Sequence, residues 1–311
     1  MSRFIVKQPG LLTLIQDGGR FGVHNIGLTN GGPLDTLAFG WANRLIGNKS
    51  NASTLEISFG GLSLESEVDT AIAVTGAELP IKINDNTVAQ WQTHAVKKGD
   101  AIELGYTTRG TRAYLSVAGG FNIPASFGSS ATVVREKIGG LTGEKLRAGD
   151  FLPCDSQVLS RHFRLADDDR PQYHDNALLR VVMGYQQSAF KYIEQQRFFS
   201  SDYLVTDRSD RMGFRLEGQP IKSDITGMLS EGICHGAIQI PADGQPIILM
   251  NDRQTIGGYP KIGSVIPLDT AILAQLSPGS TIRFESISLE QAHNLHWLAK
   301  SRFERTRLVQ C

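Results

Sequence analysis

The chain is patterned as short apolar runs separated by turn residues. Runs of four to six residues that are rich in Ala, Val, Ile and Leu occupy positions 71–76, 101–104, 113–118, 178–183 and 247–250. Short, turn-bounded apolar segments of this kind are typical of β-strands. The 33 glycines supply many positions at which the backbone can turn. The pattern therefore predicts a mostly-β architecture.

A weak internal repeat supports small barrels. Residues 98–104, 146–152 and 276–284 share one outline, in which a turn with Gly and Asp or Ser leads into an apolar strand. A tight turn that feeds each closing strand is typical of small β-barrels. The spacing of the three copies is irregular, which excludes a solenoid.

Only a few helices are expected. Residues 34–46 carry an apolar stripe at helical spacing, and Asp35 falls in the first turn, where a carboxylate faces the positive end of the helix. A short helix is predicted at 187–196 and an amphipathic one at 289–305.

A polar, proline-interrupted stretch at 166–176 reads as the linker between two domains. We expect an N-terminal β domain at 1–170, a C-terminal β domain with the main polar motifs at 171–286, and a helical tail at 287–311.

Composition excludes several classes of partner. Lys+Arg and Asp+Glu both number 31, which gives no electrostatic case for binding nucleic acid or an anionic membrane. No run of 18 apolar residues is present. The three cysteines lack metal-ligand spacing and favour a reduced, cytoplasmic protein.

The segment 239–261 is the most informative part of the sequence. The apolar run ending at Met250 is followed by five consecutive hydrogen-bonding side chains, Asn251 to Thr255, and then by Gly257 and Gly258. A strand that delivers polar groups onto a glycine turn is a common way to build a site. A hairpin with a solvated tip is the alternative.

Three other polar segments have the same character. Arg211 precedes a Met-Gly pair, Glu231 lies between Ser and Gly, and Asp17 and Arg20 flank two glycines. Arginine can present its planar fork to a carboxylate or phosphate, and the buried amide of Gln239 could pair with a substrate amide. Structural pairing is the alternative for each of them.

We therefore predict two sets of site residues and no metal site. The predicted catalytic residues are Arg211, Glu231, Asp252 and Arg253. The predicted substrate-binding residues are Gln239, Gln254, Thr255, Gly257, Gly258, Tyr259, Lys261, Asp17, Arg20 and Asp35. The histidines show no metal-binding spacing, and there is no Walker A loop, Rossmann fingerprint or Gly-x-Ser-x-Gly elbow.

These ordered motifs resemble one family over about residues 6–284. The segments 16–22, 31–35, 209–218, 230–232 and 239–261 are similar to those of the KipA-like, or allophanate hydrolase subunit 2, family. Its members include the C subunit of 5-oxoprolinase and part of the carboxyltransferase domain of urea carboxylase. The resemblance implies two cyclophilin-like β-barrel units.

The resemblance also implies a function. It indicates a subunit of an ATP-dependent 5-oxoprolinase, inactive alone, that works with a KipI-like and a LamB/YcsF-like partner, one of which could bind the ATP. Two alternatives are a KipA-type regulatory module that binds a kinase inhibitor and a carboxyltransferase-type subunit acting on a urea-like amide. Urea carboxylase carries Asn where this chain has Gln239, which argues against urea. Without an Ala-Met-Lys-Met sequence, no covalently attached biotin is expected.

Overall fold

The computed structural model describes residues 2–225 and 227–311, which divide into two compact units. Unit 1 contains residues 2–23, 30–173 and 307–311, and unit 2 contains residues 24–29 and 174–306. The chain thus passes from unit 1 to unit 2 after Tyr173, three residues beyond the predicted boundary at 170. Residues 307–311 belong to unit 1, whereas the sequence suggested one continuous tail from 287 to 311.

Unit 1 is built from two antiparallel sheets. The six-stranded sheet has the order β11-β1-β4-β9-β6-β7, and the five-stranded sheet has the order β2-β3-β10-β5-β8. The strands of the first sheet are β1 (Arg3–Pro9), β4 (Gly60–Ser66), β6 (Ile81–Ile83), β7 (Asn86–Val88), β9 (Ala101–Tyr106) and β11 (Phe151–Pro153). Those of the second are β2 (Leu12–Gln16), β3 (Thr54–Ser58), β5 (Thr70–Glu78), β8 (Thr93–Val96) and β10 (Arg109–Val117). A short pair, β12 (Phe163–Arg164) and β22 (Val309–Gln310), brings the C-terminal residues onto this unit.

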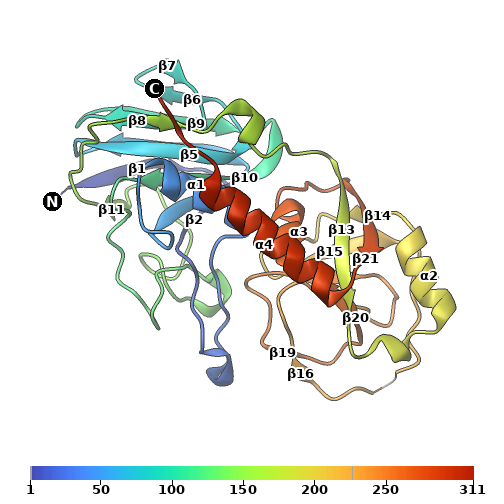
Figure 1. The fold of residues 1–311 in the computed structure, drawn as a ribbon. Helices are drawn as coiled ribbons and strands as arrows, with labels where there is room; N and C mark the ends of the chain where they lie inside the picture. Colours follow the sequence, from blue (N-terminus) through green and yellow to red (C-terminus); the bar gives the residue numbers. More distant parts are fainter. Residues whose placement is uncertain (1, 226) are drawn as a thin grey trace. The chain divides into compact units, whose positions relative to one another are not determined.

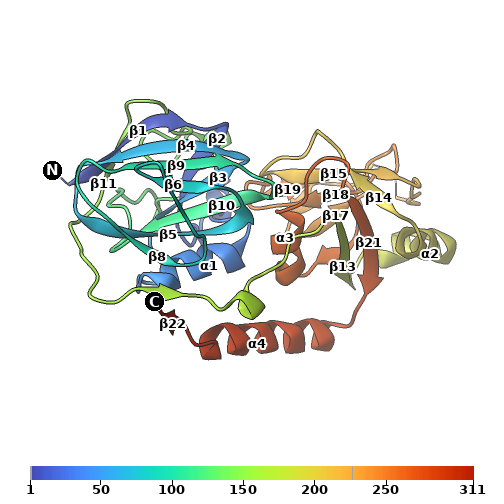
Figure 2. The same ribbon diagram turned by 90° about the horizontal axis from the view of Figure 1, so that it is seen from above.

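The two sheets of unit 1 share one hydrophobic core. Phe4 and Leu64 from the first sheet belong to the same buried cluster as Ile57 and Leu115 from the second. Helix α1 (Thr36–Leu45) packs against β5 and β10 (Figure 2). Unit 1 is therefore a pair of sheets around one core rather than one closed ring of strands.

Unit 2 is a closed seven-stranded barrel with the order β13-β20-β17-β18-β15-β14-β21 (Figure 1). Its strands are β13 (Asn176–Met183), β14 (Tyr203–Val205), β15 (Gly213–Gly218), β17 (Ala237–Gln239), β18 (Ile247–Leu249), β20 (Lys261–Val265) and β21 (Thr281–Ser286). The neighbours pair antiparallel except β13 and β21, which run parallel from Asn176↔Thr281 to Val181↔Ser286. This parallel pair closes the ring.

Unit 2 also contains helices and one ribbon that are not part of the barrel ring. The helices are α2 (Tyr192–Ser200), α3 (Pro267–Leu273) and α4 (Leu289–Arg305), and a separate two-stranded ribbon joins β16 (Glu231–Gly232) to β19 (Ile256–Gly257). Helix α2 is fixed by Phe198, whose ring stacks on that of Phe284 with centroids 4.3 Å apart. Helix α4 begins with a capping box of Ser288 and Gln291, and none of its residues is buried.

The prediction of a mostly-β chain is confirmed. The helix predicted at 34–46 is α1, and the one predicted at 289–305 is α4. The helix predicted at 187–196 is misplaced, because Phe190 is extended and buried and divides a 3-10 turn at Gln187–Ala189 from α2. Within residues 2–225 and 227–311, no helix combines the length and apolar character that a bilayer crossing requires.

A buried ion pair ties two turns of the barrel together. Arg211 Nε and Nη2 donate to Asp252 Oδ2 and Oδ1 at 2.9 and 3.0 Å, and both side chains are buried. The backbones of the two turns are also paired, since Asp252 N donates to Arg211 O at 2.9 Å. Asp210 closes the first turn by accepting from Met212 N at 2.8 Å.

Arg211→Ala should therefore act on stability. Removing the guanidinium takes two charged hydrogen bonds from the buried Asp252 carboxylate, which should lower the free energy of unfolding by about 3–5 kcal/mol. Chemical denaturation followed by circular dichroism measures the loss. Arg283→Ala is the matched control, because its ion pair with Asp202 is exposed and contributes little. Equal, small losses in the two variants would contradict a structural role for Arg211.

Candidate functional site

Three barrel strands end at the same rim of unit 2. Strand β13 ends at Met183, β17 ends at Gln239, and β20, antiparallel to both, begins at Lys261. The register of β17 against β20 shifts between Ile238 and Gln239, which marks a bulge beside the pair Gln239↔Lys261. At this rim the chain gathers polar groups from segments that are far apart in sequence.

The centre of the cluster is an ion pair between the ribbon and the barrel. Glu231 on β16 accepts a short hydrogen bond from Lys261 Nζ on β20. Gln186, in the turn after β13, donates from Nε2 to the same oxygen, Glu231 Oε1, at 2.7 Å. The other end of the Gln186 amide, Oε1, accepts a hydrogen bond from Lys261 N at 2.8 Å. The side chain of Gln186 therefore joins Glu231 to Lys261.

The donors around Glu231 keep its carboxylate ionised. The hydrogen bond from Lys261, followed by that from Tyr185, lowers the pKa of Glu231 below its ordinary value. The hydrogen bond between Tyr185 and Glu231 in turn raises the pKa of Tyr185, whose phenol is largely exposed. Lys261 is buried and Glu231 is about one-third exposed, so the pair sits where buried structure meets solvent.

Gln239 carries a buried hydrogen-bond donor that is not paired within the described chain. Its side chain is only 4% exposed, and among the residues described no acceptor lies within hydrogen-bond distance of Nε2. Leaving such a group unpaired costs about 1–3 kcal/mol. Thr132 Oγ1 and His235 Nε2 are also buried without a partner among the described residues, but Gln239 Nε2 is the one such atom that lies on the strand pair Gln239↔Lys261.

The glycine turn is needed for space at this point. A Cβ on Gly257 would lie 2.5 Å from Ile233 Cδ1 and 2.7 Å from Gln239 Nε2. Gly257 pairs with Glu231 across the ribbon, so the Gln239 amide and the Glu231 cluster meet at the same strand pair. Gly258 has only ordinary clearance, with Met228 O and Ser230 Oγ both 3.4 Å from a Cβ placed there.

The predicted residues Asp252, Arg253 and Arg211 lie in the barrel framework. Arg253 is buried and donates from Nε to Ile233 O at 3.1 Å and from Nη1 to Met250 O at 3.3 Å. Burial lowers the pKa of its guanidinium. Burial, with the charge of Arg253 nearby, also lowers the pKa of His235 to about 4, so His235 is neutral at pH 7. These contacts fix the backbone that leads to the ribbon.

The remaining predicted residues of unit 2 lie along the ribbon and its turn. Gln254 is exposed, Thr255 is half-buried, and Tyr259 is 50% exposed. Thr255 O accepts from Ile233 N at 3.1 Å, which extends the ribbon by one hydrogen bond.

Asp17 and Arg20 belong to unit 1 and organise loops there. Asp17 Oδ1 accepts from Gly19 N at 2.9 Å and from Ser129 Oγ at 2.5 Å, and Oδ2 accepts from Ser130 N at 2.7 Å. Arg20 is 1% exposed, and its Nη2 donates to Ala131 O at 2.7 Å. Both side chains bind the same loop, which indicates a structural function for them.

Asp35, also in unit 1, caps helix α1. Its Oδ1 accepts from Leu37 N at 3.1 Å and from Ala38 N at 2.9 Å, while Tyr173 OH donates to Oδ2 at 3.2 Å. Burial raises the pKa of Tyr173 and of Tyr114, whose hydroxyl donates to Glu56 at 2.7 Å in the same network. This network buries Asp35 within unit 1.

Sequence reasoning missed Gln186 and Tyr185. They lie 45 and 46 residues before Glu231 in an unremarkable Gly-Tyr-Gln-Gln turn, and no motif singles them out. Their position directly after a predicted strand was the only available signal. Among the described residues, no group of three His, Cys, Asp or Glu side chains could hold a metal ion.

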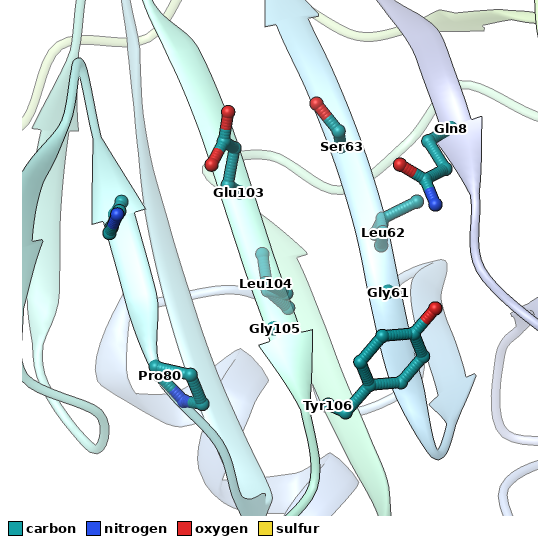
Figure 3. A pocket seen from close by; sticks show the side chains of 10 residues that line it. Gln8, Gly61, Leu62, Ser63, Pro80, Glu103, Leu104, Gly105 and Tyr106 are labelled. Atoms are coloured by element: carbon teal, nitrogen blue, oxygen red, sulfur yellow. The ribbon is translucent and has the colours of Figure 1, made fainter.

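A separate cavity of about 410 Å³ lies on the six-stranded sheet of unit 1 (Figure 3). Gln8, Ser63, Glu103 and Lys82 form a cross-strand row along it, since Gln8 pairs with Ser63, Ser63 with Glu103, and Glu103 with Lys82. None of the predicted site residues lines this cavity.

Glu231→Gln should reveal the ionised carboxylate through the pH dependence of stability. Because the folded pKa of Glu231 is lowered, its stabilising contribution is present above the unfolded value of about 4.3 and is lost as the pH falls through the folded value. The difference in unfolding free energy between wild type and variant should narrow below about pH 4.3. Glu217→Gln, at an exposed position of β15, is the control. If the difference in unfolding free energy between wild type and Glu231→Gln did not change with pH, Glu231 would not be an ionised carboxylate with a lowered pKa.

Comparison with known proteins places this arrangement in a family. The family described as carboxyltransferase domain, subdomain A and B, matches residues 26–286. The chain is 39% identical over 288 residues to the 5-oxoprolinase C subunit of Escherichia coli K12, covering 92% of both chains. It is 37% identical over 282 residues to the 5-oxoprolinase C subunit of Haemophilus influenzae, covering 90% of both.

Solved structures show the same fold. The urea carboxylase of Kluyveromyces lactis superimposes with a TM-score of 0.91 at 30% identity, over 98% of this chain. The match spans 29% of that longer chain. The sequence-based assignment to this group is therefore confirmed. This chain belongs to the carboxyltransferase domain family, subdomains A and B.

Proposed function

We propose that the chain is a subunit of an ATP-dependent 5-oxoprolinase, which opens the lactam ring of 5-oxo-L-proline to give L-glutamate. The identities of 39% and 37% to two bacterial 5-oxoprolinase C subunits, each over at least 90% of both chains, support the proposal. The observation that carries it in the structure is the unpaired, buried amide N–H of Gln239 beside the Glu231–Lys261 pair.

The groups at the rim suit the chemistry of a lactam. Gln239 Nε2 would donate to the lactam carbonyl oxygen, a contact that gains strength as negative charge develops there. Water adds to the carbonyl carbon, the carbon–nitrogen bond breaks, and the leaving nitrogen takes a proton. Lys261, held by Glu231, is a proton donor at the same rim.

The nucleotide is a co-substrate that this cluster is poorly suited to hold. Transfer of the γ-phosphoryl group from ATP to the lactam oxygen, with release of ADP, would make the lactam carbon more electrophilic. After water has added and the carbon–nitrogen bond has broken, a second water would release phosphate from the resulting acyl phosphate and leave the carboxylate of glutamate. However, Lys261 is already paired with Glu231, and the sequence has no Walker A loop. We therefore assign ATP binding to a partner subunit and propose a KipI-like and a LamB/YcsF-like protein as the partners, in the cytoplasm.

A carboxyltransferase function is the second candidate. The TM-score of 0.91 to the Kluyveromyces lactis urea carboxylase supports it. The same rim would then bind a urea-like amide, and a carboxylated biotin would come from another chain, because this one lacks the biotin attachment sequence.

The proposal predicts activity only in an assembled complex. Co-expression of the chain with a KipI-like and a LamB/YcsF-like protein should yield a complex that releases glutamate from 5-oxo-L-proline when ATP is present. The chain alone should release little or none. Bicarbonate-dependent consumption of urea, with no glutamate from the complete complex, would favour the carboxyltransferase function instead.

Gln239→Leu separates a substrate contact from a structural one. Because Nε2 has no partner among the described residues, its removal should leave the melting temperature unchanged or slightly raised. The kcat/KM for 5-oxo-L-proline should fall about two- to tenfold, as expected for one lost hydrogen bond of about 0.5–1.5 kcal/mol, and kcat should share the loss because the contact strengthens in the transition state.

Gln172→Leu, at an exposed position of unit 1, serves as the control and should change none of these values. Unchanged kinetics in a well-folded Gln239→Leu complex would remove Gln239 from the site. A large fall in melting temperature would instead show that its amide has a structural partner.

A further inference from the structure

Gln186 occupies a turn that rests on the barrel. Gly184 N donates to Ile262 O at 3.0 Å, and Gln187 N donates back to Gly184 O at 3.0 Å, so the turn after β13 is fixed against β20. The Gln186 backbone has φ −88° and ψ 10°, an unstrained turn conformation. The side chain therefore starts from a defined position.

The two ends of the Gln186 amide have different and complementary partners. Oε1 accepts from the backbone N–H of Lys261 at 2.8 Å, and Nε2 donates to Glu231 Oε1 at 2.7 Å. The first contact is with the barrel, and the second is with the ribbon, in which β16 pairs with β19. The side-chain amide supplies an acceptor at the first of these points and a donor at the second, without carrying a charge.

Glu231 is thereby held by two donors on one oxygen. Lys261 Nζ and Gln186 Nε2 both reach Oε1, and the titratable groups that act on this carboxylate are Lys261 on β20 and Tyr185 in the turn after β13. Without Gln186, the ribbon carboxylate would depend on the long, rotatable side chain of Lys261 and on the exposed Tyr185.

We propose that Gln186 is a positioning residue of this site, which fixes the ribbon carboxylate of Glu231 and the first residue of β20 in one geometry around the Gln239 amide. It acts through Glu231 and Lys261 and is not itself assigned a contact with substrate. The inference rests on the proposed function only for its kinetic consequences, since the contact itself can be tested in the isolated chain.

The sharpest test replaces the amide of Gln186, which donates to Glu231, with a carboxylate. Gln186→Glu is nearly isosteric, but it places like charge against Glu231, which should shift the titration of Glu231 upward. Carbon-13 NMR of the glutamate carboxyl groups in the isolated chain measures this shift, and Glu231→Gln assigns the resonance. Gln187→Glu is the matched control, because it adds the same charge one residue further on at an exposed position.

An upward shift in Gln186→Glu but not in Gln187→Glu supports the proposal. No shift in Gln186→Glu, or the same shift in both variants, overturns it. If Gln186→Glu does not fold, Gln186→Met provides the second variant, since it removes both hydrogen bonds without adding charge. It should also shift the Glu231 titration upward, and an unchanged titration in that variant overturns the proposal as well.

Kinetics of the assembled complex give the second measurement. Gln186→Met should lower kcat for glutamate release about tenfold, as expected for a lost hydrogen bond to a charged group. Gln186→Glu should move the acidic limb of the pH–rate profile upward, and Gln187→Glu should leave it in place. A Gln186→Met complex with wild-type kcat contradicts the positioning role. If the wild-type complex itself releases no glutamate, the proposed function fails, and the NMR titration alone decides on Gln186.

Discussion

The closure of the barrel in unit 2 is the constraint on which the site depends. Strand β13 pairs in parallel with β21 on one side and antiparallel with β20 on the other, so it is the strand that completes the ring. Closure satisfies the backbone hydrogen bonds that an open edge would leave exposed. It also carries the turn after β13 to the start of β20, where Gln186 contacts both Lys261 and the ribbon residue Glu231.

The buried polar side chains of unit 2 differ in whether they have hydrogen-bond partners within the described chain. Arg211, Asp252 and Arg253 are buried and have partners that hold turns of the barrel, so their charge contributes to the framework. Gln239 is equally buried but has an amide N–H without a partner in the described chain. An unpaired buried donor costs free energy unless a water or a ligand pairs with it, and the lactam carbonyl of the proposed substrate is one such partner.

Polar residues near glycines in unit 1 illustrate the limits of motif reading. Asp17 precedes a pair of glycines in the sequence, and so does Asp252. The side chain of Asp17 nevertheless binds the loop that contains Ser129 and Ser130. Asp35 caps α1, as its place in the first helical turn suggested. The chemistry of a side chain was readable from the sequence, whereas its partner was not.

The sequence by itself determined what depends on neighbours along the chain. Short apolar runs between turns indicate strands, helical spacing located α1 and α4, and the ordered polar segments identified the family. Phe190 interrupted the third predicted helix because its ring is buried, a tertiary effect that local pattern does not contain. Only the tertiary structure decided that Gln186 belongs with Glu231 and Lys261 and that Gln239 remains unpaired. The physical reason is that a hydrogen bond requires a donor and an acceptor about 3 Å apart. Gln186 is 45 or more positions from both of its partners in the sequence. The register of the closed barrel, which local pattern does not contain, brings these atoms within that distance.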